Sequence, residues 1–293
     1  MAEENIVNAF TVDVEDYFHV QAFENITDRK HWDDYECRVE NNTRKILDLL
    51  NRHNVKGTFF ILGWVAERYP QLVREIDDAG HEIGCHSYWH KLIYEMTPDE
   101  FREDLMMATK IIEEIISKPV KSFRAPCFSI IEKSLWALDV LIEEGFTQDS
   151  SIFPVHHDNY GIPNAERFPH VLERSNGALF EFPPSVSRFV KFNLPISGGG
   201  YFRLYPFRMS ASLLNKINIK QNQPFMFYIH PWELDTDQPR MKAPLKSRFR
   251  HYQNLKTTER KLKKLLTQFN FNTMTEALEQ RQTQAAQHET LSA

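Results

Sequence analysis

Strand-like and helix-like segments alternate along most of this chain, and that alternation restricts its fold more than any other feature. Residues 6–14, 57–63 and 224–230 are apolar runs rich in β-branched and aromatic residues, as in strands that are buried on both faces. Residues 98–117 have apolar positions at helical spacing, with Thr97 as the expected N-cap. Such alternation predicts a parallel sheet covered by helices, either an open doubly wound sheet or a closed β/α barrel.

The remaining elements follow the same order. Further strands are expected at 81–86, 120–126 and 146–151, a pair of helices over 64–80, and further helices at 39–54, 131–145, 206–219 and 248–268. Between about 155 and 205 the helical signal disappears, and short strands joined by long loops are expected. There is no evident linker or repeat, so we expect one domain over 1–275. Residues 276–293 lack apolar periodicity and are expected to be a frayed or disordered tail.

Composition excludes several classes of function. A net charge of −5 argues against nucleic-acid binding that depends on phosphate neutralisation. Three scattered cysteines are too few for a disulfide framework or a four-sulfur zinc site. The first residues show no basic region followed by an apolar run, and no stretch approaches the roughly 18 apolar residues of a spanning helix. We therefore expect a cytoplasmic globular protein without a secretory signal, a transmembrane segment or a nucleic-acid partner.

Polar side chains stand at the end of five of the strand-like runs. These side chains are Asp13, Glu15 and Asp16, the pair His86 and His90, Arg124, Asp149, and His230. In folds built on parallel strands, functional residues gather at the carboxyl ends of the strands. The sequence therefore predicts that these side chains meet in one site.

The histidine pair and the acids suggest a metal site. His86 and His90 are four residues apart, so on one helical turn both imidazoles would face one zinc ion. Asp13 and Glu15 share a face of an extended strand, where two carboxylates repel unless a cation lies between them or one is protonated. Asp16 is either a second candidate ligand or the cap of the following turn. Two histidines and one carboxylate, with the fourth position left to water, form an arrangement for catalysis.

Taken together, the motifs T-V-D-V-E-D, H-S-x-x-H, F-R-A-P, D-S-S and Y-I-H-P-W-E resemble those of the polysaccharide deacetylase (NodB-homology, carbohydrate esterase) family. More narrowly, V-D-V-E-D-Y-F, R-A-P-x-F-S, G-G-G-Y-F-R and H-P-W-E resemble the branch associated with exopolysaccharide loci. The resemblance runs from about residue 8 to 270. It implies an α/β fold of parallel strands, a distorted (β/α) barrel, and zinc-type hydrolysis of an acetamide.

The resemblance also implies a role for each residue at the strand ends. Glu15, His86 and His90 match metal ligands, with Asp16 as the rival for the acidic position. The matching catalytic residues are Asp13 as the base, Arg124 as the residue that orients it, Asp149 as the acid that tunes the catalytic histidine, and His230 as the general acid. Cys127 and Tyr228 depart from the family pattern, so the shape of the pocket is expected to differ more than the reaction.

The expected function is hydrolysis of the N-acetyl group of an N-acetylhexosamine unit, in a polysaccharide or its lipid-linked precursor, with a divalent metal ion, foremost Zn²⁺. A cytoplasmic location favours the precursor, built at the inner membrane face. The basic stretch 240–251 is then a candidate for peripheral contact with anionic lipid or pyrophosphate, or else a solvated loop. Two alternatives stay open: an allantoinase-like amidohydrolase that acts on a small molecule, and a sugar-binding pseudoenzyme.

Overall fold

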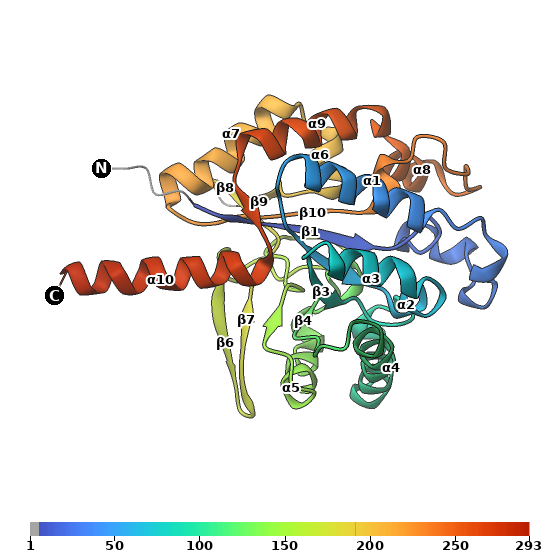
Figure 1. Cartoon of the computed structure of the whole chain (residues 1–293), viewed down its shortest axis with the longest axis horizontal. Helices are drawn as coiled ribbons and strands as arrows, with labels where there is room; N and C mark the ends of the chain where they lie inside the picture. The colour runs from blue at the N-terminus through green and yellow to red at the C-terminus, as the bar shows by residue number, and fades with distance from the viewer. Residues whose placement is uncertain (1–5, 191, 293) are drawn as a thin grey trace.

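A sheet of mainly parallel strands runs through the centre of the protein (Figure 1). The computed structural model describes residues 6–190 and 192–292, with side chains up to residue 283. Residues 1–5, part of the segment on which the expected lack of a secretory signal rests, lie outside the described residues. The expected α/β class with parallel strands is confirmed.

The strands of the main sheet are β1 (Asn8–Val14), β2 (Thr58–Ile61), β3 (Glu82–Cys85), β4 (Ser122–Phe123), β5 (Gln148–Asp149), β6 (His170–Arg174), β7 (Gly177–Glu181), β10 (Met226–Ile229) and β11 (Phe271–Asn272). Their order is β10-β1-β2-β3-β4-β5-β7-β6, and β11 pairs with β1. Among the strands that the structure describes in this sheet, only β6 and β7 pair antiparallel. Strands β8 (Val186–Phe189) and β9 (Phe192–Pro195) form a separate antiparallel hairpin.

The segment between β7 and β10 links strand β7, next to one edge of the sheet, with β10 at the other edge. The hydroxyl of Ser185 accepts a hydrogen bond from the Met226 N–H (2.9 Å), and the carbonyl of Ser197 accepts one from the Tyr228 N–H (2.8 Å). At Gly198 the backbone has φ 148° and approaches so closely that a Cβ would lie 2.0 Å from the carbonyl oxygen of Tyr228. Only glycine fits there, so Gly198 is required for this close approach.

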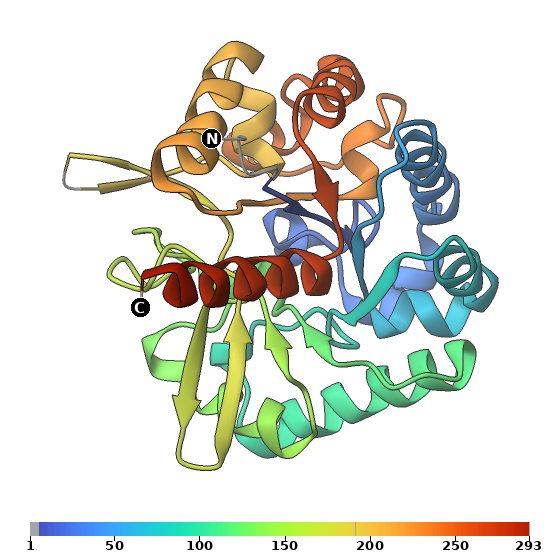
Figure 2. The ribbon, with the colours of Figure 1, turned by 60° about the vertical axis from the view of Figure 1, so that its left-hand side comes forward.

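Ten α-helices in the described ranges surround the sheet (Figure 2). They are α1 (Val39–Arg52), α2 (Gly63–Arg68), α3 (Pro70–Asp78), α4 (Pro98–Ile116), α5 (Trp136–Glu143), α6 (Gly199–Leu204), α7 (Phe207–Asn215), α8 (Leu245–Tyr252), α9 (Leu255–Gln268) and α10 (Met274–Ser292). Helix α4 begins with the expected capping box of Thr97 and Glu100. None of the helices in the described ranges is long and apolar enough to cross a membrane.

Helix α10 covers the amino ends of the strands (Figure 2). The Met274 N–H donates to the hydroxyl of Thr58 (2.7 Å), and the Thr275 N–H donates to the carboxylate of Glu82 (3.1 Å). Thr58 and Glu82 are the first residues of β2 and β3. One end of the sheet is therefore covered by α10. The division of the chain at residue 275 stays a prediction.

The single helix expected over 248–268 is wrong. The chain forms two helices, α8 and α9, which are separated at Gln253 and Asn254, and Asn254 has φ 55°. The interruption coincides with contacts to a cation that is distant in sequence. The buried guanidinium of Arg203 binds the carbonyl oxygens of Arg250 (3.1 Å), His251 (2.5 Å) and Gln253 (3.1 Å), groups that a continuous helix would use for its own hydrogen bonds.

Candidate active site

The side chains expected at the strand ends come together at the carboxyl end of the sheet. Strand β1 carries Asp13 and leads into Glu15. The parallel pairing of Val12 with Ile229 places His230, the residue that follows β10, beside Asp13. The ring Nε2 of His230 lies 3.7 Å from Oδ2 of Asp13 and 3.6 Å from Oε1 of Glu15. The sheet register alone therefore brings together residues that are more than 200 positions apart in the chain.

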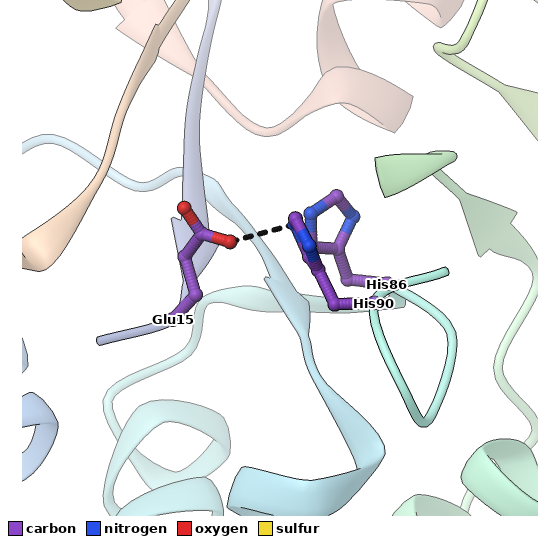
Figure 3. Close-up of side chains that lie close together, drawn as sticks. All are labelled: Glu15, His86 and His90. Carbon is purple, nitrogen blue, oxygen red and sulfur yellow. Dashed lines mark ion pairs between the residues drawn. The ribbon is translucent and has the colours of Figure 1, made fainter. Parts of the chain in front are cut away.

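Glu15, His86 and His90 form a compact cluster (Figure 3). One ligand atom from each lies within 4.8 Å of the others, and all three side chains are buried. Glu15 Oε2 is 2.8 Å from Nε2 of His90. One carboxylate and two imidazoles at this spacing are a donor set that suits zinc.

The sequence suggested that both histidines lie on one helical turn, but in the structure they do not. They are carried by a loop after β3 in which Ser87 (φ 64°) and His90 (φ 51°) have left-handed backbone conformations. The buried carboxylate of Asp104, on α4, holds this loop by accepting hydrogen bonds from the N–H groups of Tyr88 (2.8 Å) and Trp89 (3.0 Å). Asp104 was missed because an acid within a helix-like segment gives no sign that it faces inward.

Burial and neighbouring charges shift the pKa values of two groups in the cluster. Nδ1 of His86 lies 2.7 Å from the carbonyl oxygen of Arg124, which directs Nε2 toward the cluster. Burial lowers the pKa of His86 to about 4, against the opposing charge of Asp13, so the ring is neutral and able to ligate. Burial by itself would raise the pKa of Glu15, but His90 and the other two histidines hold it below its ordinary range. The donor set is thus an ionised carboxylate with a neutral imidazole.

The structure does not bring Asp16 into this cluster. Its carboxylate accepts hydrogen bonds from the backbone N–H groups of Tyr17 (2.8 Å), Arg38 (2.5 Å) and Val39 (2.8 Å). The last two belong to the start of α1, so Asp16 caps that helix from a distance. Of the two roles that the sequence left open for Asp16, the geometry supports the cap.

Single substitutions should separate these two acids. We expect Glu15→Gln to lower metal affinity by at least about 10-fold while the fold is kept, because a ligand charge is lost. We expect Asp16→Ala to leave metal stoichiometry unchanged and to destabilise the fold by about 1–3 kcal/mol, since buried N–H groups lose their acceptor. Metal analysis and thermal unfolding of both variants measure this. Equal metal loss in the two variants would contradict the assignment.

Asp13 is held by a fully buried arginine. Nη1 of Arg124 donates to Oδ1 of Asp13 at 2.6 Å and also to the hydroxyl of Thr11 at 2.8 Å. Nη2 donates to the hydroxyl of Ser150 at 2.9 Å. With Oδ1 fixed in this way, the second oxygen of Asp13 faces His230.

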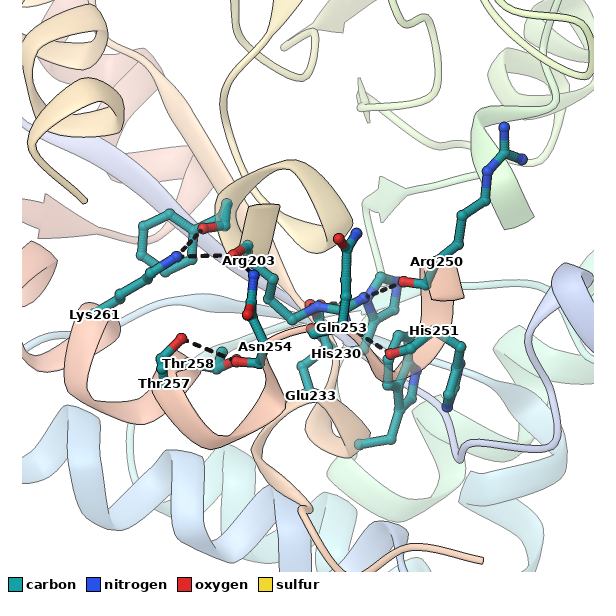
Figure 4. A network of polar contacts seen from close by, with 12 residues as sticks. Arg203, His230, Glu233, Arg250, His251, Gln253, Asn254, Thr257, Thr258 and Lys261 are labelled. Atoms are coloured by element: carbon teal, nitrogen blue, oxygen red, sulfur yellow. Dashed lines mark hydrogen bonds and ion pairs between the residues drawn. The ribbon is translucent and has the colours of Figure 1, made fainter. Parts of the chain in front are cut away.

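His230 is connected to a second buried arginine through Glu233 (Figure 4). Nδ1 of His230 lies 2.8 Å from Oε1 of Glu233, and Oε2 of Glu233 accepts from Nε of Arg203 at 2.6 Å. Burial acts to lower the pKa of His230, but the hydrogen bond that its ring donates to Glu233 and the charges of Glu15, Glu233 and Asp13 outweigh it and raise the pKa to about 9. At neutral pH the ring is therefore a cation, with Nε2–H directed at the acids.

The resemblance implied that Asp149 tunes the catalytic histidine. In the structure it is Glu233 that contacts the ring of His230. The carboxylate of Asp149 instead accepts from the hydroxyl (2.5 Å) and the N–H (3.2 Å) of Ser151. The Ser151 hydroxyl in turn accepts from the N–H of Ala125 at 2.8 Å. Asp149 thus supports the segment that follows β4. Glu233 was visible in the H-P-W-E motif, three residues after His230, but the sequence alone does not show which acid reaches the ring.

The buried pair Asp149 and Glu181 should make stability depend on pH. Burial, and for Glu181 also the charge of Asp149, raises the pKa of both carboxyls. A carboxyl whose pKa is raised by folding stabilises the fold below its ordinary pKa, and this contribution is lost as pH rises through the folded pKa. We expect Glu181→Gln to gain melting temperature over the wild type as pH increases from about 5 to 8. The exposed control Glu173→Gln should show no such trend. A difference in melting temperature between Glu181→Gln and the wild type that stays constant with pH would contradict the raised pKa values of Asp149 and Glu181.

Cys127 lies near the site but does not supply a thiolate. Burial, and then the charge of Glu15, raise the pKa of its thiol well above the ordinary range. A thiol that stays protonated is neither a nucleophile nor a metal ligand at neutral pH. The three cysteines are all free. The chemistry of the site therefore rests on its carboxylates and imidazoles.

Comparison with known proteins agrees with this geometry. Residues 31–141 match the polysaccharide deacetylase family, and residues 150–279 match a domain of unknown function, DUF3473. A peptidoglycan-N-acetylglucosamine deacetylase of Bacillus cereus is 40% identical over 98 residues, which are 33% of this chain and 36% of that protein. The peptidoglycan-N-acetylmuramic acid deacetylase PdaA of Bacillus subtilis is 34% identical over 84 residues, 29% of this chain and 32% of that protein. The chain thus spans about a third of the length of these curated relatives.

The fold as a whole has a solved counterpart. The crystal structure of a putative polysaccharide deacetylase from Mycobacterium smegmatis superimposes with a TM-score of 0.64 at 21% identity and covers 97% of this chain and 92% of that one. The similarity thus includes residues 150–279, beyond the segment matched to the deacetylase family. Residues 31–141 therefore contain a polysaccharide deacetylase (NodB-homology) segment, and the chain as a whole has the fold of the Mycobacterium smegmatis protein.

Proposed function

We propose that this protein is a metal-dependent N-deacetylase that acts on an N-acetylhexosamine unit of a polysaccharide or of its lipid-linked precursor. The observation that carries the proposal is the cluster of Glu15, His86 and His90, with Asp13 and His230 directly beside it. The matched relatives are named as deacetylases of peptidoglycan sugars, which supports an N-acetylated saccharide as substrate. The cytoplasm, at the inner membrane face, is the proposed place of action.

In this proposal Glu15, His86 and His90 hold the metal ion, with Zn²⁺ the best fit to one carboxylate and two imidazoles. When bound, such an ion polarises the amide carbonyl and lowers the pKa of water from 15.7 toward about 7. The protein contributes the orientation of its ligands. The carbonyl of Arg124 fixes the ring of His86, and Asp104 fixes the loop that carries both histidines.

Asp13 and His230 supply the proton transfers. Asp13 accepts the proton of the attacking water on its free oxygen, because Arg124 occupies the other one. His230, a cation at neutral pH, donates its Nε2 proton to the nitrogen of the leaving amine. Glu233 holds Nδ1 of His230 and so fixes which nitrogen faces the substrate. A base and an acid placed in this way each add typically about 10²–10⁴-fold to the rate.

A buried aromatic cluster lies beside the catalytic residues, and we propose that its edge next to His230 positions the sugar ring. Phe128, Phe153, Tyr160 and Tyr228 pack together there with Val155 and Val186. The ring of Tyr228 lies 5.9 Å from that of His230. Aromatic faces offer broad apolar surface at low entropic cost, which suits the apolar face of a saccharide. Tyr228 is also a position at which this chain departs from the family pattern, so it is a candidate determinant of substrate choice.

Acetate release from a panel of substrates tests the proposal. The metal-loaded protein should release acetate from at least one N-acetylated saccharide, either free or lipid-linked, and Asp13→Asn should not. Allantoin and related small amides belong in the same panel, because release of product from these alone would favour the amidohydrolase alternative. Saccharide binding without acetate release from any member would favour a pseudoenzyme. Either result would overturn the proposed function.

A further inference from the structure

Helix α8 presents an apolar stripe to solvent that the proposed mechanism does not use. Leu245 and Phe249 are one helical turn apart and are 80% and 63% exposed. His251, on the opposite side of the same helix, is buried. The outermost line of α8 is therefore apolar, although an exposed helix face in a globular protein is ordinarily polar.

Basic side chains flank this stripe on both sides. Lys246 and Arg250 follow Leu245 and Phe249 by one position each, and Arg248 precedes Phe249, so all three project beside the stripe at helical spacing. All three are exposed. The chain has no acidic residue between positions 238 and 258, whereas its net charge is −5. This face thus concentrates positive charge on an otherwise acidic protein.

Helix α8 is fixed to the active site rather than attached by a free loop (Figure 4). Arg203, which holds Glu233, also binds the carbonyl oxygens at the end of α8. The ring of His251 stacks on Trp232 at 4.1 Å, and the indole N–H of Trp232 donates to Glu15 at 3.3 Å. Two side chains thus separate α8 from a proposed metal ligand.

We propose that α8 docks this protein on an anionic lipid bilayer, with Leu245 and Phe249 among the acyl chains and with Lys246, Arg248 and Arg250 at the headgroups. A short helix with an apolar stripe between basic flanks is the pattern of interfacial membrane helices, and the basic flanks match the negative surface of such a bilayer. The partner is a lipid surface because the stripe is exposed and is bordered by one sign of charge on both sides. The inference rests on the proposed function, since docking through α8 would present the active site to a saccharide carried at that surface.

Vesicle flotation tests the proposal with the metal-loaded full chain. The protein should bind vesicles of phosphatidylcholine with about 30% phosphatidylglycerol and bind pure phosphatidylcholine much less. Leu245→Ser with Phe249→Ser should lower the partition coefficient about 10-fold or more, because two large apolar side chains no longer insert. Lys246→Glu with Arg248→Glu should remove the preference for anionic vesicles. Ile219→Ser, at a site 73% exposed in the π-helical turn Lys216–Lys220, is the matched control and should bind as the wild type does.

Three results would overturn the proposal. The first is binding to anionic vesicles at the wild-type level in both α8 variants, and the second is no binding by the wild type itself. The third is loss of binding in Phe189→Ser with Phe192→Ser, on the exposed hairpin tip, while the α8 variants bind normally. Vesicle binding needs no turnover, and the Leu245/Phe249 variant should still release acetate from a water-soluble substrate as the wild type does. Failure of the membrane proposal is thereby distinguished from failure of the proposed deacetylase activity.

Discussion

Replacing His86 with alanine is expected to leave the purified protein without a stoichiometric divalent metal and without acetate release. The ring is buried, neutral, and oriented by the Arg124 carbonyl, so no other described side chain stands in its place. Loss of an outer partner of a metal ligand typically costs about 10–100-fold in affinity, so we expect loss of the ligand itself to exceed about 100-fold. Metal analysis after gentle purification, together with an acetate assay, measures both effects.

A matched control separates ligand loss from misfolding. His81 is also buried and also has a pKa lowered to about 4 by burial, but its Nδ1 accepts the N–H of Gly57 at the amino end of the sheet. His81→Asn should keep its metal, because the amide oxygen can accept the same hydrogen bond. Full metal content in His86→Ala would contradict the proposed site. Equal metal loss in both variants would show that the effect is one of folding.

Replacing His230 with alanine is expected to lower turnover by about 10²–10⁴-fold while the metal, unlike in His86→Ala, is retained. Nε2 of His230 lies 3.6 Å or more from the acids, and its Nδ1 is engaged by Glu233, so the ring is placed to donate a proton rather than to ligate. Metal content and kcat, measured on the same preparation, decide the matter. Metal loss in this variant would move His230 into the set of ligands.

The pH dependence of kcat gives a second measure of the same role. Activity that needs protonated His230 is lost as pH rises through the pKa of the ring, which Glu233 helps to raise to about 9. Glu233→Gln removes that charge, so the alkaline limb of the kcat profile should move to lower pH. Glu173→Gln, an exposed change far from the ring in sequence, should leave the limb in place. An unmoved limb in Glu233→Gln would show that Glu233 does not tune the ring.

The position of the site could be predicted from the sequence because it depends on local pattern and sheet geometry. Apolar runs identified the central strands, and polar residues after them, such as Asp13 and His230, had to meet at one edge of a parallel sheet. The acid in the metal cluster remained undecided between Glu15 and Asp16. It depends on which carboxylate turns toward the N–H groups of Arg38 and Val39, and no spacing in the sequence encodes that contact.

The supporting residues could not be predicted, since their partners are distant in sequence. Asp104 binds loop residues 15 and 16 positions earlier, and Arg203 binds Glu233 30 positions later. The helical pattern over 248–268 is continuous, but the helix is interrupted where its carbonyl groups bind the guanidinium of Arg203. A pattern of apolar residues reports what one segment would do alone. Long-range hydrogen bonds to the backbone decide where it stops.

Arg203 also has a consequence for how this protein can change over evolution. One buried cation ends a helix and at the same time neutralises the carboxylate beside the proton donor. A neutral residue at position 203 would leave both Glu233 and several carbonyl groups without a partner, so two unrelated properties would fail in a single step. Lineages of this protein should therefore keep position 203 nearly invariant, or exchange it only together with position 233, while exposed residues of α8 vary with the surface that each relative meets.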